Sequence, residues 1–243
     1  MARVHGQSAR IYLDEYNLSG RTNKVELIMD QDMPEVTCFE DTGKAFVVGR
    51  PGWTANYEGF ADYTAAEIDA IIEAAKTGTH NVGIYMAGSG AAGYEGVGIL
   101  KMQSRESENS DAAKMKWSIT GAEGAFLGRG VLISNGLAVT GTGAQTGVSF
   151  GGTVAVGKTV RLTSRVIAVS GAGSLTVALQ ESSDNGGGDP YATIIAGTAQ
   201  TAVGAVVSTT VAGGTLGAWF RTNVTAFSGF TSVTLRTSVT VLG

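Results

Sequence analysis

The first sixty residues alternate apolar and polar positions in short runs that polar turns separate. The alternation has a period of two in residues 9–14 and again in residues 24–27, after a turn at residues 17–20. Each run places apolar side chains on one face and polar side chains on the other, which is typical of a strand that is buried on one side. A long loop from Cys38 to Pro51 leads into a further predicted strand at residues 54–60. The pattern predicts an N-terminal β-domain.

One helix is predicted after these strands. Thr64 and Glu67 match a capping box, apolar residues recur at helical spacing from Ile68 to Ala75, and Gly78 stands where a C-terminal cap is expected. We expect an amphipathic helix of about three turns that packs on a sheet.

Further strands are predicted at residues 94–104 and 114–119, on either side of a charged segment at residues 105–112. In the second of these strands Trp117 and its apolar neighbours face one side, and Lys116 and its polar neighbours face the other. Two strands around a charged tip predict a β-hairpin.

From about residue 135 the composition shifts to Gly, Thr, Val, Ala and Ser, and no helical pattern follows. Short strand candidates recur between glycine-rich turns, at residues 160–169, 175–180, 191–195, 203–211, 219–225 and 233–241. This spacing predicts an all-β sandwich of about a hundred residues, with Leu175 and Leu235 in its inward-facing rows. We therefore expect a mainly β chain in two domains: a β-sandwich or barrel with one flanking helix at residues 1–136, and a C-terminal β-sandwich at residues 137–243.

Composition narrows the class of protein. The 243 residues include 36 glycines and 3 prolines, which favours strands and tight turns over helices. Charged residues make up only 16%, as expected either for a surface that neighbouring subunits cover or for a stable sandwich with a Ser/Thr-rich exterior. The single cysteine, Cys38, excludes an intrachain disulfide. The N-terminus lacks the apolar core of a signal peptide and no 18-residue apolar run is present, so we expect synthesis in a cytosol and no membrane insertion.

Charge is distributed unevenly along the chain. Residues 1–134 carry 12 basic and 18 acidic side chains, a balance of 12 − 18 = −6, whereas residues 135–243 carry 5 and 3, a balance of +2. A net acidic half is not expected to bind nucleic acid as a ligand, because phosphate binding requires a Lys/Arg surface.

Several local motifs resemble enzyme or metal sites without their required context. Residues 152–159 fit the phosphate-binding loop, but a β-branched, alternating segment follows where a helix is needed. Residues 147–151 fit a hydrolase nucleophile elbow, but both histidines, His5 and His80, precede it. Neither histidine has ligands at zinc spacing, and the acidic group around Asp30 lacks the pattern of a calcium loop. We expect no enzyme activity, no cofactor and no metal.

Spaced small and apolar residues carry a resemblance to a known family. In the first half these are residues 4–6, 18–20, 25–26, 36–39, 47–49 and 59–62, and in the second half residues 175–185, 219–221 and 229–233. Together they resemble the major tail proteins of long-tailed phages (siphoviruses), in which a tube domain is often followed by a β-sandwich.

The resemblance implies a structural function. It implies that the chain is a tail tube subunit that assembles as stacked, hexameric rings in the virion, made in the host cytoplasm, with other tail proteins such as tape measure, terminator and distal tail proteins as partners. DNA passes through the lumen during ejection without specific binding. Acidic walls repel the phosphate backbone.

Two sets of residues are candidates for these roles. The lumen-facing acidic candidates are Glu26, Asp30, Glu106, Glu108 and Asp111. The candidates for ring-to-ring stacking, which lie in the long loop, are Glu40, Asp41, Lys44 and Arg50. A long loop inside a compact domain usually has a function.

Alternative functions remain open at this point. The C-terminal sandwich could carry a carbohydrate-binding, receptor-binding or capsid-decoration function. Separately, Trp53, Trp117 and Trp219 are, together with the tyrosines, candidates for a sugar-stacking platform or, alternatively, for core and subunit contacts. An enzyme that uses the phosphate-loop or serine motif is a third class. Tubes of contractile tails and secretion systems are related possibilities.

Overall fold

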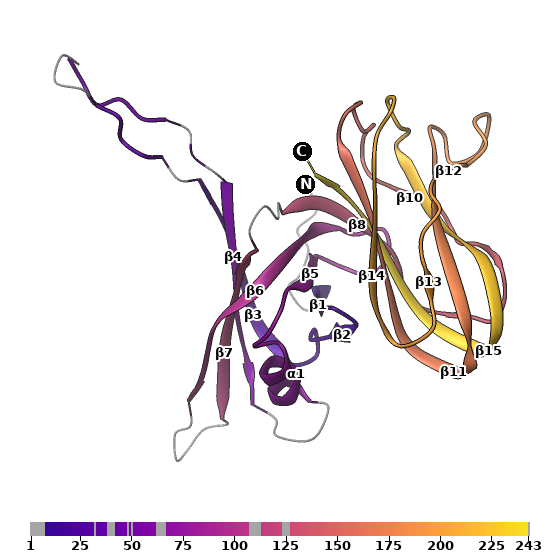
Figure 1. Ribbon diagram of the computed structural model, residues 1–243, viewed down its shortest axis with the longest axis horizontal. Coiled ribbons are helices and arrows are strands. Elements are labelled where there is room, and N and C mark those ends of the chain that lie inside the picture. The colour runs from indigo at the N-terminus through magenta and orange to yellow at the C-terminus, as the bar shows by residue number, and fades with distance from the viewer. Residues whose placement is uncertain are drawn as a thin grey trace. The chain divides into compact units, whose positions relative to one another are not determined.

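The chain is mainly β, as predicted. The computed structural model describes residues 8–31, 33–37, 42–47, 49, 51–61, 67–106, 113–122 and 127–242, and in them it contains fifteen strands and one helix (Figure 1). The chain divides into two compact units. Unit 1 comprises residues 1–19, 81–96 and 128–243, and unit 2 comprises residues 20–80 and 97–127.

The division into units differs from the predicted boundary between residues 136 and 137. That boundary falls inside β8 (Gly128–Val139), whose residues pair along β15 (Trp219–Leu242) on both sides of the boundary. Unit 1 also takes in two N-terminal segments, because β1 (Arg10–Leu13) pairs with β5 (His80–Tyr85). Strand pairing between segments far apart in the sequence cannot be recognised from the local pattern of apolar and polar residues.

Unit 1 is an antiparallel assembly around two long strands, β11 (Thr159–Ser182) and β15. Its sheet order runs β12-β11-β15-β8-β6-β5-β1-β2. The remaining members of this order and the short strands attached to it are β2 (Tyr16–Asn17), β6 (Ala92–Glu106), β9 (Gly143–Ala144), β10 (Val148–Ser149), β12 (Ala192–Ile195), β13 (Ala199–Gln200) and β14 (Gly204–Val211). Strand β6 begins in unit 1 and ends in unit 2.

The two long strands correct the prediction of four shorter ones. The segments predicted as separate strands at 160–169 and 175–180 are both parts of β11, and those at 219–225 and 233–241 are both parts of β15. The glycine-rich segments between them form irregularities in the β11–β15 pairing rather than chain reversals. Gly171 and Gly229 adopt φ values of 87° and 77°, and Gly171 pairs with Phe230. Because glycine accepts positive φ without a steric penalty, both strands can bend at the same level.

One hydrophobic core contains residues from both halves of the two long strands. Leu175 and Val177 from the second half of β11 share it with Val160 and Leu162 from the first half and with Leu235 from β15. Both predicted inward-facing residues, Leu175 and Leu235, are fully buried. The prediction of inward rows is therefore confirmed, although the rows belong to bent strands.

Unit 2 is built on four antiparallel strands in the order β3-β4-β7-β6. These are β3 (Thr22–Gln31), β4 (Pro51–Phe60), β7 (Lys114–Gly121) and the part of β6 from Gly98 onward. The predicted hairpin is confirmed by the pairing of β6 with β7, which ends at Glu106 and Lys114. One face of this sheet carries the apolar core, where Trp117 stacks on Tyr57 with ring centroids 5.3 Å apart.

The helix is shorter than predicted. α1 (Ile68–Ala74) has seven residues, and Glu67 stands at its N-cap without a side-chain cap bond. Glu67 pairs with Arg21 instead of forming the predicted capping box, and Thr64 lies outside the described residues. The buried side chains of Ile68, Ile71 and Ile72 confirm the predicted apolar face. Arg105 of β6 joins α1 to the sheet through Asp69 at 2.7 Å and Glu73 at 3.4 Å.

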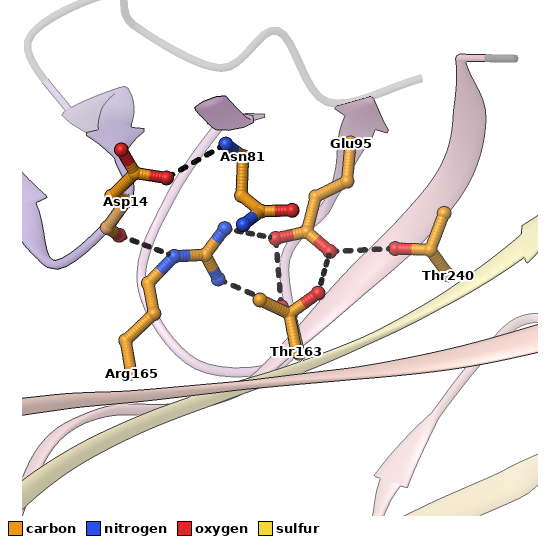
Figure 2. A network of polar contacts seen from close by, with 7 residues as sticks. Asp14, Asn81, Glu95, Thr163, Arg165 and Thr240 are labelled. Carbon is orange, nitrogen blue, oxygen red and sulfur yellow. Dashed lines mark hydrogen bonds and ion pairs between the residues drawn. The ribbon is translucent and has the colours of Figure 1, made fainter. Parts of the chain in front are cut away.

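A buried ion pair connects five strands of unit 1 (Figure 2). The Glu95 carboxylate of β6 lies 2.6 Å from the guanidinium of Arg165 in β11, and both side chains are almost inaccessible to water. Glu95 also accepts hydrogen bonds from the hydroxyls of Thr163, Ser238 and Thr240. Arg165 donates to the carbonyl oxygen of Asp14 just after β1, and the Asp14 carboxylate accepts the backbone N–H of Asn81 in β5.

The network keeps Glu95 charged. Burial acts to raise the pKa of this carboxyl, but Arg165, Arg161 and the hydrogen bond from Thr240 outweigh burial, so the pKa lies below its usual value. A buried charge that is paired and hydrogen-bonded in this way is costly to disturb, because removing one partner leaves the other charge uncompensated. The pair therefore specifies how the strands of unit 1 come together.

Replacing Leu235 with alanine tests the common core. We expect Leu235→Ala to lower the free energy of unfolding by about 2–5 kcal/mol, because the leucine is fully buried and leaves a cavity. Its cross-strand partner Leu137 is 45% exposed and supplies the matched control, for which Leu137→Ala should change stability by less than about 0.5 kcal/mol. Urea unfolding followed by fluorescence measures both, and equal effects would contradict the assignment of the core.

Replacing Glu95 with glutamine tests the buried pair. We expect Glu95→Gln to destabilise the protein by about 3–5 kcal/mol at neutral pH, because Arg165 then lacks its counter-charge. Glu106→Gln, which removes one partner of the exposed pair with Lys116, should have little effect.

The same variant has a defined pH dependence. Because the folded pKa of Glu95 lies below the unfolded value of about 4.3, its contribution is complete above that value and is lost as the pH falls through the folded pKa. The stability difference between wild type and Glu95→Gln should therefore narrow on acidification below about pH 4.3. Thermal unfolding from pH 7 to pH 3 measures this difference, and a gap that widens on acidification would show that the pair does not act as described.

Candidate assembly surface

The sheet of unit 2 has two faces with different chemistry. The register places Tyr57, Trp117 and Leu100 on one face, which we call the core face. The opposite face, which we call the outer face, carries side chains that share one side of the four strands: Lys24, Glu26, Ile28 and Asp30 of β3, Thr54, Asn56 and Glu58 of β4, Lys114, Lys116, Ser118 and Thr120 of β7, and Ile99, Met102, Ser104 and Glu106 of β6. The predicted alternation in β7 is thus confirmed.

Three of the lumen-facing candidates lie together on the outer face. Glu26, Asp30 and Glu106 all project from it and are all exposed, although they come from two strands far apart in the sequence. Glu108 and Asp111 lie outside the described residues. Whether this face lines a lumen remains a prediction.

The outer face is not a uniformly acidic wall. Glu58 adds a fourth carboxylate, and Lys24, Lys114 and Lys116 occupy the same face, so the balance over these described residues is 3 − 4 = −1. The Lys116 ammonium donates to both carboxylate oxygens of Glu106 at 2.9 Å. The hydrogen bond and charge of Glu106 raise the pKa of Lys116 above its usual value. Over these described residues the face therefore combines a small negative balance with a paired lysine and carboxylate, Lys116 and Glu106.

The sheet of unit 2 ends in two edges that lack described strand partners. Strand β3 pairs with β4 alone among the described strands. From Leu100 to Arg105, the edge of β6 opposite β7 borders a hollow of about 360 Å³ that Lys76 also lines. An unpaired edge exposes a row of backbone donors and acceptors that can hydrogen-bond to another strand.

An extended arm continues from β3 and β4. Figure 1 shows this arm projecting beyond the end of the two strands as a narrow extension, in which two segments of the chain run side by side. Its two sides are joined by a bridge between Glu35 and Phe46 and by a backbone hydrogen bond of 2.9 Å from Val36 to Ala45. Apolar side chains on the arm are exposed, with 56% for Met33 and 52% for Phe46. Exposed apolar side chains on an extension are expected where another molecule covers them.

One of the four stacking candidates is described in this arm. Lys44 is described, and its ammonium lies 3.0 Å from the carboxylate of Glu35 on the opposite side of the arm. Glu40, Asp41 and Arg50 lie outside the described residues. The structure thus assigns Lys44 a contact within the arm, and the contribution of the loop to stacking stays a prediction.

The motifs that resemble enzyme sites adopt other structures. Strand β11 begins at Thr159, the last residue of the phosphate-loop pattern at residues 152–159, so the predicted strand stands where that motif needs a helix. Ser149 of the elbow pattern lies in β10, which pairs with β15. Trp53 and Trp117 are buried, as expected of core residues rather than a sugar-stacking platform.

The described residues contain neither a cluster of metal ligands nor a helix that could cross a membrane. No group of three or more His, Cys, Asp or Glu side chains is placed to hold a metal ion in the part of the chain that the structure describes. Within the same residues, no helix has the length and apolar character needed to cross a membrane.

The sequence missed three features of this surface. The sequence does not indicate the unpaired edges, because an edge strand is recognised only when the pairing of all strands in the sheet is known. It also missed Lys101, which falls in an irregularity of the β6–β7 pairing between Leu100 and Met102. The exposed apolar residues of the arm could have been found, since Phe46 and Val47 stand in a long loop between strands.

Comparison with known proteins gives weak structural likenesses. No protein-family model matches the chain, and no curated protein matches its sequence. A chain from the tail of an empty gene transfer agent (GTA) particle with C6 symmetry has a TM-score of 0.38 at 12% identity, over 51% of this chain and 98% of that chain. A chain from the virion of a native GTA particle has a TM-score of 0.38 at 10% identity, over 52% and 98%.

A third likeness extends over nearly the whole chain. The Dit protein (gp 19.1) of SPP1, described as a paradigm of the hub adsorption apparatus in phages that infect Gram-positive hosts, has a TM-score of 0.36 at 10% identity, over 96% of this chain and 98% of that chain. Two of these chains come from the tail or virion of a gene transfer agent, and the third comes from the adsorption hub of a phage. At TM-scores below 0.5 they do not establish a shared fold, and the function proposed below is supported by the chain's own surfaces.

Proposed function

We propose that this protein is a non-catalytic structural subunit of a phage tail tube, which assembles as stacked hexameric rings around a channel for DNA. The observation that carries the proposal is the four-stranded sheet of unit 2, whose two edges have no strand partner among the described residues. The sequence resemblance to major tail proteins supports the hexameric state, and the virion location and the other tail proteins as partners belong to the same proposal.

The strand directions of the sheet suit ring closure. The order β3-β4-β7-β6 is antiparallel at every step, so β3 and β6 at the two edges run in opposite directions. Rotation about a ring axis keeps the direction of each strand along that axis. The β6 edge of one copy therefore meets the β3 edge of the next in antiparallel orientation, and closing the ring pairs every edge.

A closed ring of this kind has a channel of suitable size. Six copies of a four-stranded sheet give a barrel of about 24 strands, which at a spacing of about 4.8 Å and a tilt of about 40° has a backbone diameter of about 50 Å. Inward side chains narrow this diameter and still leave space for a DNA duplex.

The outer face suits a channel through which DNA passes without binding. Its lysines have acidic neighbours, as Lys116 has Glu106, so they are less available to phosphate groups. Phosphate binding depends on uncompensated Lys/Arg charge, so a paired face gives little affinity for a passing duplex. In this proposal DNA does not adhere because the lysines of the channel wall are paired with carboxylates. Repulsion by a uniformly acidic wall is not required.

The arm suits contact between successive rings. Its exposed apolar side chains, among them Met33 and Phe46, lie on an extension of the same strands that would form the ring wall. Head-to-tail contact of two different surfaces repeats without limit, which is what a tube requires.

Assembly of the purified protein tests this function. We expect rings or hollow tubes in negative-stain electron microscopy, with a mass that rises with concentration in light scattering. Phe46→Glu should leave the fold intact but prevent stacking, because a carboxylate replaces a 52%-exposed apolar contact. Val203→Glu, which changes a 45%-exposed apolar residue in unit 1, is the matched control and should assemble as wild type. A protein that stays monomeric at its highest soluble concentration would contradict the proposal.

A further inference from the structure

We propose a specific register for the junction between neighbouring copies: β3 of one copy pairs with β6 of the next so that Ile28 lies opposite Ile99 and Glu26 lies opposite Lys101. This inference rests on the proposed function, since it needs a ring in which the two edges meet. The partner is a second copy of this chain.

The first observation is an uncharged row across the outer face. Ile28 of β3 pairs with Thr54, Thr54 with Thr120, and Thr120 with Ile99 of β6. The hydroxyls of Thr54 and Thr120 lie 3.3 Å apart, which confirms that the row shares one face. The row ends in Ile28 at the β3 edge and in Ile99 at the β6 edge, and each of these side chains is 42% exposed. Joining the two edges with this row aligned brings the isoleucines together and removes apolar surface from water.

The second observation is the charge sequence along the two edges. In an antiparallel pair with Ile28 opposite Ile99, counting two residues in opposite directions places Glu26 opposite Lys101. Lys101 is exposed and lies in the irregularity of the β6–β7 pairing, where it has no cross-strand partner in β7. Opposite charges in directly facing positions stabilise a strand pair.

The neighbouring registers are unfavourable. A shift of two residues in one direction places Lys24 opposite Lys101, and a shift of two in the other places Ile28 opposite Lys101 and Asp30 opposite Ile99, so that apolar and charged side chains face each other. Like charges in directly facing positions destabilise a strand pair. A shift of one residue would turn Ile28 toward the face opposite that of Ile99. The charges thus select the register that also aligns the isoleucines.

The edge of β6 has room for an added strand. The hollow of about 360 Å³ follows six consecutive residues, from Leu100 to Arg105, and Lys76 borders it. A strand paired there would lie about 4.8 Å from β6 and would satisfy the backbone groups of that edge. The acidic residue Glu26 of β3 complements the basic residue Lys101 beside the hollow, whereas Lys76 already pairs with Glu73 at 2.6 Å.

Disulfide cross-linking tests the register. In a Cys38→Ser background we would introduce Ile28→Cys and Ile99→Cys together and oxidise the assembled protein. Directly facing positions of paired strands meet the Cα and Cβ distances of a disulfide, so we expect a ladder of cross-linked species on a non-reducing gel that ends at the closed ring and that reductant abolishes. The control pair Ile28→Cys and Gln103→Cys is displaced by four residues, about 13 Å, and should not cross-link.

Cross-linking separates failure of the register from failure of the function. If the Cys38→Ser parent forms rings but the 28/99 pair gives no ladder, or the 28/103 pair gives one, the register is wrong and the proposed function stands. If the parent forms neither rings nor tubes, both fail.

Charge exchange provides a second measurement. We expect Glu26→Lys to raise the concentration required for assembly by about threefold or more, because it places a lysine opposite Lys101. Adding Lys101→Glu should restore assembly by exchanging the two charges. Glu58→Lys changes a carboxylate on the same face in the interior strand β4, and Lys101→Glu should not rescue it. Equal rescue of both lysine variants would overturn the pairing of Glu26 with Lys101.

Discussion

The carboxylate of Glu95 has no access to water, and unit 1 is organised around satisfying it. A charge in the interior is tolerated only when a counter-charge and hydrogen-bond donors surround it. Arg165 supplies the charge, and hydroxyls from β11 and β15 supply the donors. Arg165 in turn donates a hydrogen bond to the backbone carbonyl of Asp14, just after β1. Compensation of the buried Glu95 charge therefore connects the N-terminal strands with the long strands β11 and β15.

Unit 2 shows the opposite situation, in which backbone groups are left without described partners. The edges of β3 and β6 and the apolar arm are costly for an isolated subunit, because open edges invite association. In the ring that we propose, the same features would form the contacts between subunits. The function proposed here draws on this difference: unit 1 pairs its buried Glu95 and Arg165 charges internally, whereas the edges of unit 2 lack described strand partners.

Part of the candidate surface was accessible from the sequence. Alternation in residues 114–119 correctly placed Lys116 and Trp117 on opposite faces, and Glu26, Asp30 and Glu106 do share one exposed face. Their lysine neighbours were not recognised, because the pairing of Lys116 with Glu106 depends on the register of two strands. The prediction of an acidic wall considered net charge along the chain, whereas electrostatics at a surface depends on which charges are adjacent in space.

The sequence by itself determined the class of structure. Period-two alternation and abundant glycine specify strands and turns, and the spacing of Ile68, Ile71 and Ile72 specifies the buried face of a helix, since these depend only on residues close in the chain. Only the tertiary structure decided that β11 and β15 continue through their glycines, that residues 10–17 and 81–96 join unit 1, and that Glu95 meets Arg165. These outcomes depend on hydrogen bonds and charges between residues far apart in sequence, and a local pattern holds no information about which distant strand will supply the partner.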